Sequence, residues 1–335
     1  MTAIEAPLET YFRTLTDVNA ADASDVVLEL LDEGTPVERI TTEVLAPAQV
    51  RVGQLWEQGR WSVSDEHAAT AVTETALSAL AAAASRRPAG PGRHVVVACA
   101  EGEWHTLPAR MAATVGAADG LRVTFLGPSV PADHLGRRLA AGDVDLLALS
   151  CTLPPNLLGA ASCVRAAHDA GVPVLAGGRA FGDTPRRAHA IGADGWAASP
   201  AALTQATPEL THGDPVIPPE AVLLDTVDDR TISLAYDLLV GAFPRLSRVA
   251  PYDQARTRED LRWMARFTGA AVLTDDASVL EEFLTWLCGL LDGPVPADVI
   301  AESARVVAEV VESFAPTGAQ LLLESADGLL GTTRA

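Results

Sequence analysis

Residues 94–118 read HVVVACAEGEWHTLPARMAATVGAA, and this stretch decides the fold. Its first seven residues form an apolar run typical of a buried strand, and its last ten residues can form a helix. A strand followed by a loop and a helix is the repeating unit of an α/β sheet. The loop carries His105, with Glu103 two residues before it. A phosphate-binding loop would be Gly-rich at this place, so the histidine indicates a different ligand.

Short apolar runs recur after residue 94, and helix-compatible stretches separate them. Alternation at this spacing predicts a doubly wound parallel sheet. Ligands of such sheets bind beyond the carboxyl ends of the strands, which is where the loop of His105 lies. The expected strands cover residues 94–100, 122–127, 145–151, 173–178 and 194–199.

The regions on either side of the sheet have helical periodicity. Near the N-terminus, the pattern predicts a four-helix bundle, in which Thr35 caps a helix and Glu38 completes a capping box. The fold class is therefore multi-domain, α and α/β. The expected domains are a bundle at 1–86, a Rossmann-like domain at 92–205 and an all-helical domain at 222–335, with linkers at 84–93 and 203–222.

Composition excludes several classes of protein. The formal net charge of −20 argues against direct binding to nucleic acid, because phosphate contacts need clustered Lys and Arg. The four cysteines have no metal-like spacing and are most simply small core residues. No signal peptide and no apolar stretch of about 18 residues is visible, so we expect a cytoplasmic protein without membrane contact.

His105 is the residue that carries chemistry. Imidazole is a common ligand of transition metals, and Glu103 can accept a hydrogen bond from the second ring nitrogen and fix its tautomer. Taken alone, His105 could equally be an ordinary loop histidine. No nucleophile–base pair and no paired carboxylates stand in a recognisable frame, so we do not expect an enzyme.

At three strand ends the sequence resembles cobalamin-binding domains. Their pattern is Asp/Glu-x-His-x-x-Gly, then Ser-x-Leu/Thr, then Gly-Gly, and Pro108 stands here where the family has its first Gly. The resemblance implies that His105 is the lower axial ligand of cobalt and that the displaced base of the cofactor runs as a tail along the sheet. The tail would pass the matching residues Ser150, Thr152, Gly177 and Gly178.

The bundle adds a second motif. Trp56 is followed, after nine residues, by Glu66 and His67, a pattern similar to the light-sensing subclass of adenosylcobalamin proteins. The resemblance implies that Trp56 packs over the adenosyl group, with Glu66 and His67 nearby. Trp104 belongs with the cofactor-binding residues and would shield the site from water. The alternative is that Trp56 is plain bundle core.

The C-terminal region has no histidine after His212, which excludes a haem held there by a proximal histidine. Domain order and helix pattern resemble the photocobilins, in which a globin-like domain binds biliverdin beside adenosylcobalamin. Under this resemblance Arg258 and Arg262 would hold the pigment's carboxylates. The alternative is a solvated face of a helix.

The expected function is that of a photoreceptor that binds adenosylcobalamin and biliverdin. Light would break the cobalt–carbon bond, the domain arrangement or the oligomeric state would change, and an unknown downstream protein would receive the signal. The main alternative is a corrinoid carrier, loaded with methylcobalamin, of a methyltransferase system. A radical-mutase subunit would need a substrate barrel of about 250 residues, which is not visible. A scaffold that merely has the fold is the remaining alternative.

Overall fold

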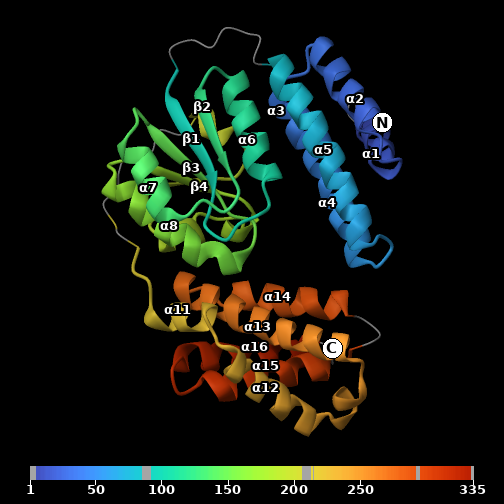
Figure 1. Ribbon diagram of the computed structural model, residues 1–335, viewed down its shortest axis with the longest axis vertical. Coiled ribbons are helices and arrows are strands. Elements are labelled where there is room, and N and C mark those ends of the chain that lie inside the picture. Colours follow the sequence, from blue (N-terminus) through green and yellow to red (C-terminus); the bar gives the residue numbers. More distant parts are fainter. Residues whose placement is uncertain (1–4, 85–91, 206–212, 214, 292–294, 333–335) are drawn as a thin grey trace. The chain divides into compact units, whose positions relative to one another are not determined.

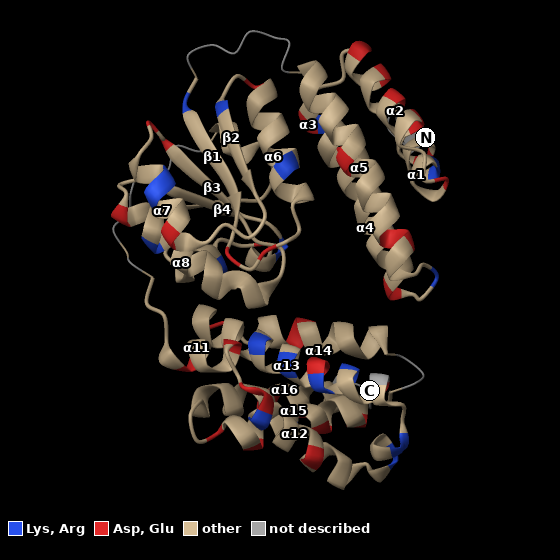
Figure 2. Ribbon diagram, in the orientation of Figure 1, with Lys and Arg blue, Asp and Glu red and all other residues tan. Residues whose placement is uncertain are grey.

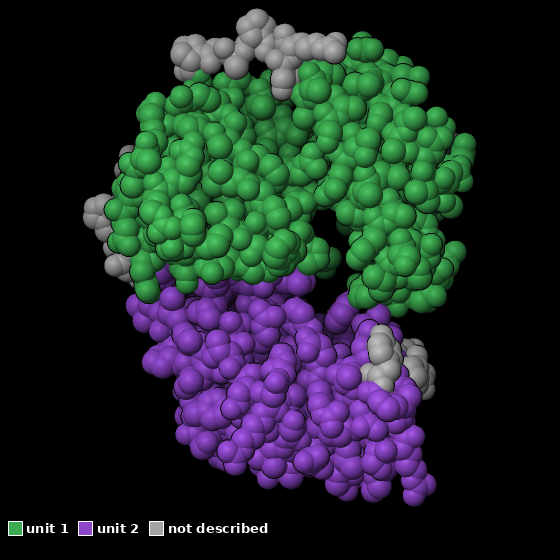
Figure 3. All heavy atoms as spheres, in the orientation of Figure 1, with its two compact units in different colours: residues 1–152, 162–189, 193–214 green, residues 153–161, 190–192, 215–335 purple. Residues whose placement is uncertain are grey.

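The structure is a computed structural model that describes residues 5–84, 92–205, 213, 215–291 and 295–332 (Figure 1). Parts of both expected linkers lie outside the described residues. The chain divides into two compact units (Figure 3). The first unit comprises residues 1–152, 162–189 and 193–214, and the second comprises residues 153–161, 190–192 and 215–335.

A parallel sheet of five strands in the order β2-β1-β3-β4-β5 forms the centre of the first unit, as predicted. The strand β1 is buried along its whole length, in keeping with its apolar run. In the register of the sheet Cys99 pairs with Ser150, and Ser150 pairs with Gly177. The loops that carry the candidate residues therefore leave the sheet side by side. The strands are β1 (His94–Cys99), β2 (Arg122–Gly127), β3 (Leu146–Ser150), β4 (Val174–Gly177) and β5 (Gly195–Ala197).

Helices follow the strands in the expected alternation. The helix α6 packs on the sheet face that Val95 and Val97 form, and Figure 1 shows α7 and α8 on the other side. Pro108 lies in the first turn of α6, where a missing N–H group leaves no bond unmade. The helical elements are α6 (Leu107–Ala118), α7 (Ala132–Ala140), η2 (Pro154–Asn156), α8 (Leu157–Asp169), η3 (Arg179–Phe181), α9 (Arg186–Ala190) and α10 (Ala202–Gln205).

The N-terminal helices surround one apolar core, which contains Tyr11, Leu15 and Leu77. The same core takes in Leu107 and Met111 from α6, so it is continuous with the helix that follows His105. Acidic residues lie along the outer side of α2 (Figure 2). The elements are α1 (Glu5–Thr16), α2 (Ala20–Asp32), α3 (Val37–Ile40), the π turn η1 (Thr41–Leu45), α4 (Ala46–Glu57) and α5 (Val63–Ala84).

The expected capping box at Thr35 is wrong. Pro36 is the N-cap of α3 and makes no side-chain capping bond, while the Thr35 N–H group bonds to the Leu30 carbonyl in the turn that closes α2. The π turn η1 was also not expected. It lies just before Pro47, which has no N–H group for a regular helical bond, and the Ala46 N–H group bonds to the Thr41 carbonyl five residues back.

The second unit is helical in its described residues from 219 onward. The helix α11 begins inside the stretch expected to be a linker, and α10 extends to residue 205, so the linker is shorter than predicted. Phe267 and Phe283 stack with ring centroids 4.0 Å apart, and Trp263 and Trp286 flank the pair. The elements are α11 (Pro219–Asp225), α12 (Asp229–Ala242), η4 (Pro244–Arg248), α13 (Pro251–Thr274), α14 (Ser278–Leu290), α15 (Ala297–Val311) and α16 (Pro316–Thr332). A globin-like fold for this unit stays a prediction.

Among the described helices, none is long and apolar enough to cross a membrane.

Candidate functional site

The loop between β1 and α6 is held by its own backbone bonds. The Glu103 N–H group donates to the Ala100 carbonyl at 2.9 Å, and the Glu103 carbonyl accepts from the Ser129 N–H group at 2.8 Å. Gly102 has φ +86, a left-handed conformation that favours glycine. The Gly102 N–H group donates to the Ser129 hydroxyl at 3.1 Å. These bonds fix the backbone from which His105 projects.

The carboxylate of Glu103 is the buried anchor of the site. Its side chain is 0% exposed, whereas the His105 side chain is 54% exposed. Glu103 Oε1 accepts from the His105 backbone N–H at 2.8 Å and lies 2.6 Å from His105 Nδ1. The other oxygen, Oε2, accepts from the Thr152 N–H at 2.7 Å and from the Cys151 thiol at 3.9 Å. Glu103 thus joins the His105 loop to the end of β3.

This arrangement determines how His105 can act as a ligand. The hydrogen bond that His105 donates to Glu103, opposed by partial burial, raises the pKa of His105, and the charges of Glu103 and Glu66 add to the increase. In neutral imidazole the proton on Nδ1 bonds to Glu103, so the lone pair lies on Nε2. A half-exposed imidazole with a fixed tautomer and a free lone pair can bind a transition metal.

The loops after β3 and β4 pack closely against each other and contain one buried polar atom without a partner in the described part of the chain. Thr152 Oγ1 is buried and, among the described residues, has no hydrogen-bond partner, which is unusual for a buried polar atom. Gly178 has φ +109, and a Cβ atom built there would lie 2.3 Å from the Cys151 carbonyl oxygen. A Cβ atom on Gly177 would lie 3.2 Å from the Ala197 carbonyl oxygen. Ser150 is 8% exposed at the end of β3. The backbone of the chain itself thus occupies the space beside both glycines, and the unpartnered hydroxyl of Thr152 is the feature that is consistent with a bound cofactor tail.

The second motif lies on α4 and α5. Glu66 and His67 form a pair at the start of α5, with 2.5 Å between His67 Nδ1 and Glu66 Oε2. Within the first unit, α5 contacts the His105 loop through the bond from the Thr106 hydroxyl to Glu74, about two turns after Glu66. Trp56 is half-buried near the end of α4.

Trp104 is 69% exposed. Its role as a shield of the site stays a prediction.

The two arginines expected to hold a pigment are engaged inside the second unit. Arg258 lies 3.8 Å above the Tyr236 ring and donates to the Gln254 carbonyl. Arg262 donates to the Val227 carbonyl at 2.9 Å and to Asp229 at 2.6 Å. A ligand carboxylate would have to compete with these contacts.

Two contributors to the site were missed from the sequence. Cys151 was interpreted as a core residue, yet its thiol donates to Glu103. Glu74 on α5 accepts from the hydroxyl of Thr106, the neighbour of His105, at 3.3 Å. The position of Cys151 inside the Ser-x-Thr motif could have indicated the first, whereas the second depends on how α5 packs beside α6.

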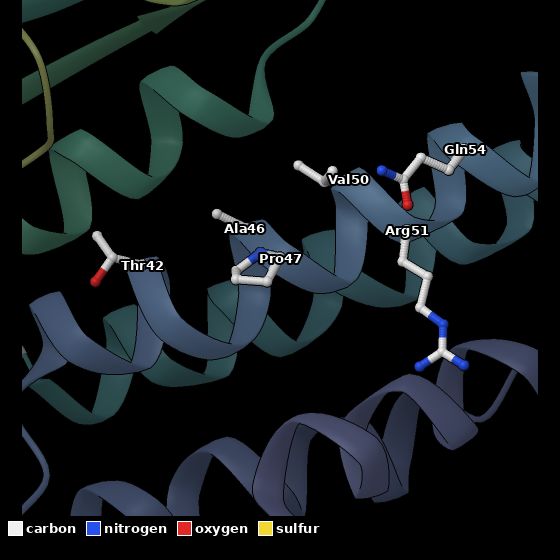
Figure 4. A pocket seen from close by; sticks show the side chains of 6 residues that line it. All are labelled: Thr42, Ala46, Pro47, Val50, Arg51 and Gln54. Carbon is white, nitrogen blue, oxygen red and sulfur yellow. The ribbon is translucent and has the colours of Figure 1, made fainter. Parts of the chain in front are cut away.

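A groove of about 560 Å³ lies elsewhere in the first unit, on η1 and α4 (Figure 4). None of the expected site residues lines this groove. The lining residues are Thr42, Ala46, Pro47, Val50, Arg51 and Gln54.

Comparison with known proteins gives a consistent result. Two family models, both described as a B12 binding domain, match residues 93–204 and residues 7–81. The HTH-type transcriptional repressor CarH of Myxococcus xanthus is 36% identical over 160 residues, which are 47% of this chain and 52% of the repressor. The chain thus spans about half the length of this curated relative. The monomethylamine corrinoid protein of Methanosarcina barkeri superposes with a TM-score of 0.53 at 20% identity, over 61% of this chain and 97% of that one.

The last similarity supports the fold alone. The curated relative is named as a repressor. The two matched domains contain both His105 and the Trp56 motif. The chain is a cobalamin-binding protein.

Proposed function

We propose that the chain is a photoreceptor that binds adenosylcobalamin in its first unit. The observation that carries the proposal is the pairing of His105 with the buried carboxylate of Glu103, in a loop that contacts α5 of the bundle through Thr106 and Glu74. A cofactor that is bound on both of its faces requires a metal ligand on one face, here His105, and residues of the bundle on the other.

His105 would hold cobalt through Nε2, because Nδ1 is bonded to Glu103. Glu103 keeps the ring oriented and makes it a better electron donor. Ser150 and Thr152 would bind the tail of the cofactor, for which the buried and unpartnered Thr152 hydroxyl offers a hydrogen bond. Gly177 and Gly178 would let the strand ends that flank the tail pack closely.

On the other face, Trp56, Glu66 and His67 would pack against the adenosyl group. When bound, the cofactor supplies a cobalt–carbon bond that light can break. The three residues would then lose the group against which they pack, and the bundle helices would take a new arrangement. We propose that this change alters self-association, or exposes a surface for a downstream protein.

Direct binding to nucleic acid is not part of the proposal. The net charge of −20 opposes it, although the curated relative is named as an HTH-type transcriptional repressor. A cytoplasmic location also stays a prediction.

Biliverdin is the second proposed ligand, in the second unit. The aromatic cluster of Trp263, Phe267, Phe283 and Trp286 supports it, because such side chains can stack on a conjugated pigment. The contacts of Arg258 and Arg262 inside the unit weigh against the carboxylate-binding role predicted for them. A red absorption band after addition of biliverdin, reduced by Trp263→Ala, would support this site, and no band would exclude it.

A corrinoid carrier of a methyltransferase system is the alternative function. The chain shares its fold with the corrinoid protein of Methanosarcina barkeri, and this likeness of fold favours the carrier function. The Trp56 motif distinguishes the two, since a carrier must expose the upper face of cobalt to a partner enzyme rather than cover it with a tryptophan.

Absorption spectroscopy in the dark and after green light tests the proposal. We expect the wild-type protein to bind adenosylcobalamin and to change its cobalamin bands on illumination. Cobalamin bound to His105→Ala should have the spectrum of cobalamin without a histidine ligand. Trp56→Ala should keep the histidine ligation but bind adenosylcobalamin less tightly than the wild type. His134→Ala is the matched control, because His134 is an exposed histidine of the same domain. A complex that ignores light, or that prefers methylcobalamin, would instead favour the carrier.

A further inference from the structure

A chain of polar side chains crosses the apolar core of the bundle. The Tyr11 hydroxyl donates to Thr73 Oγ1 at 3.0 Å, and Gln49 Nε2 donates to the same oxygen at 2.6 Å. Tyr11 and Thr73 are both 0% exposed. Burial raises the pKa of Tyr11 to about 12, so its hydroxyl keeps its proton and remains a donor at neutral pH. Helices α1, α4 and α5 each supply one of these side chains.

The chain continues from Gln49 to the surface. Thr70 on α5 lies between Gln49 and Glu66: its Oγ1 atom is 3.4 Å from Gln49 Oε1 and 2.9 Å from Glu66 Oε1. Glu66 then contacts His67, whose side chain is 73% exposed. The path therefore connects the residues proposed to face the adenosyl group with a tyrosine that is completely buried on α1.

The Thr70 hydroxyl is the element with two states. It has one proton and two possible acceptors, the carboxylate of Glu66 and the amide oxygen of Gln49. In this structure the shorter distance and the negative charge both favour Glu66. A group that hydrogen-bonds to Glu66 and draws it away would leave Gln49 as the remaining acceptor. The proton of Thr70 would then turn toward Gln49.

We propose that Thr70 and Gln49 are positioning residues for Glu66, and that they transmit the occupancy of the upper cofactor face to Tyr11 on α1. This inference rests on the proposed function, since it needs a ligand that contacts Glu66. The hydroxyl and amino groups of an adenosyl substituent are suitable donors. A second hydrogen bond at Gln49 would change the amide that bonds to Thr73, and through Thr73 the hydrogen bond of Tyr11. Coupling through a buried network needs such a two-state element, and Thr70 provides it.

The chain is well suited to a direct test, because it contains three tyrosines. Protein labelled with 3-fluorotyrosine should give three ¹⁹F resonances, and Tyr11→Phe assigns one of them to Tyr11. The other two, Tyr236 and Tyr252, belong to the second unit and serve as references. Spectra are recorded without ligand, with adenosylcobalamin in the dark, after green light, and with hydroxocobalamin, which has no adenosyl group.

We expect the Tyr11 resonance to move with adenosylcobalamin, to return toward its starting position after light, and to stay in place with hydroxocobalamin. Gln49→Leu should bind the cofactor and lose the movement. Gln54→Leu is the matched control: it makes the same change on the same helix, at an exposed residue that takes no part in the network, and should behave as wild type.

Thr70 supplies a second pair of variants in case Gln49→Leu does not fold. Thr70→Val removes the hydroxyl and should lose the movement. It should not weaken dark binding, because the bond between Thr70 and Glu66 that the ligand must break is already absent. Thr70→Ser keeps the hydroxyl and should restore the movement. A Tyr11 resonance that ignores adenosylcobalamin in a protein that binds it, or that moves equally in Gln49→Leu, would overturn the inference. A protein that binds no cobalamin would overturn the proposed function, and the inference with it.

Discussion

Replacing Glu103 with glutamine tests the centre of the candidate site. The substitution preserves shape and removes the charge. The carboxylate accepts hydrogen bonds at both of its oxygens, from the His105 N–H groups at Oε1 and from the Thr152 N–H group at Oε2. A glutamine has one oxygen and one NH₂ group, so in either orientation one set of N–H donors faces another donor. We therefore expect Glu103→Gln to damage both folding and ligand binding.

The magnitude follows from the number of bonds lost. One buried hydrogen bond to a charged group contributes about 1.5–3 kcal/mol, and the bonds that remain become neutral and weaker. We expect the free energy of unfolding of the ligand-free protein to fall by about 2–3 kcal/mol. Loss of a carboxylate that orients a metal-binding histidine typically weakens metal binding by about 10–100-fold, and we expect the same for cobalamin.

The pH dependence gives an independent signature. Glu103 raises the pKa of His105 in the folded protein, so this pair stabilises the ligand-free fold fully below the ordinary histidine pKa of about 6.5. That contribution is lost as the pH rises through the raised pKa. In Glu103→Gln the pKa of His105 should fall, and this part of the pH dependence should disappear.

Urea unfolding measures the first effect, and an NMR titration of the His105 ring protons measures the pKa. Glu101→Gln is the matched control, because Glu101 is an exposed carboxylate two residues away in the same loop, and a glutamine oxygen can keep the bond it accepts there, from the Ala132 N–H group. If Glu103→Gln kept both the stability and the His105 pKa of the wild type, the proposed role of the buried carboxylate would be wrong.

Three further predictions concern the sheet, the bundle and the second unit. Gly178→Ala should destabilise the fold by about 3 kcal/mol or more, because the new Cβ atom would lie 2.3 Å from a backbone oxygen and φ at this position is +109. The control Gly171→Ala has φ +73 but open space around it and should lose only about 1 kcal/mol, so equal losses in urea unfolding would contradict the steric reason. Burial raises the pKa of Tyr11 to about 12, whereas the tyrosine of the unfolded chain loses its proton near pH 10, so the free energy of unfolding should fall by about 1.4 kcal/mol per pH unit between about pH 10 and 12. Tyr11→Phe should lack this fall, and parallel curves of stability against pH for the two proteins would contradict the prediction. Phe283→Ala, at a 5% exposed stacked ring, should lose about 3–5 kcal/mol, measured by thermal unfolding of the full chain, and a loss below 1 kcal/mol would show that the stack is not a core.

The sheet could be predicted because its strands carry their own signal. The run before Cys99 is apolar on both faces, which is typical of a strand covered on both sides. The bounds of β2 are as predicted, and the other four strands differ from their predicted bounds by one or two residues at an end. The helix break at η1 could not be predicted in the same way. Pro47 indicates an interruption, but whether the helix kinks, ends or widens into a π turn depends on packing around it.

The site was predictable where it depends on neighbours in sequence. Glu103 and His105 are two residues apart, and the loop geometry brings the carboxylate to the ring as expected. The contacts that join separate segments were not predictable, among them the bond between Thr106 and Glu74 and the exposure of Trp104. Such features follow from the packing of helices, about which the residues of a single loop contain no information.

The helix α6, which begins two residues after His105, belongs to two hydrophobic cores at once. Leu107, Met111 and Val115 pack into the bundle, whereas Ala109 and Ala113 pack against the sheet. Lifting the bundle away from α6 would expose large apolar side chains to water, so bundle and sheet should unfold together as one cooperative unit. A bundle that responds to its ligand is therefore restricted to shear: it can slide along α6 by small steps while the apolar contact persists, and the first turn of that helix adjoins the proposed cobalt ligand.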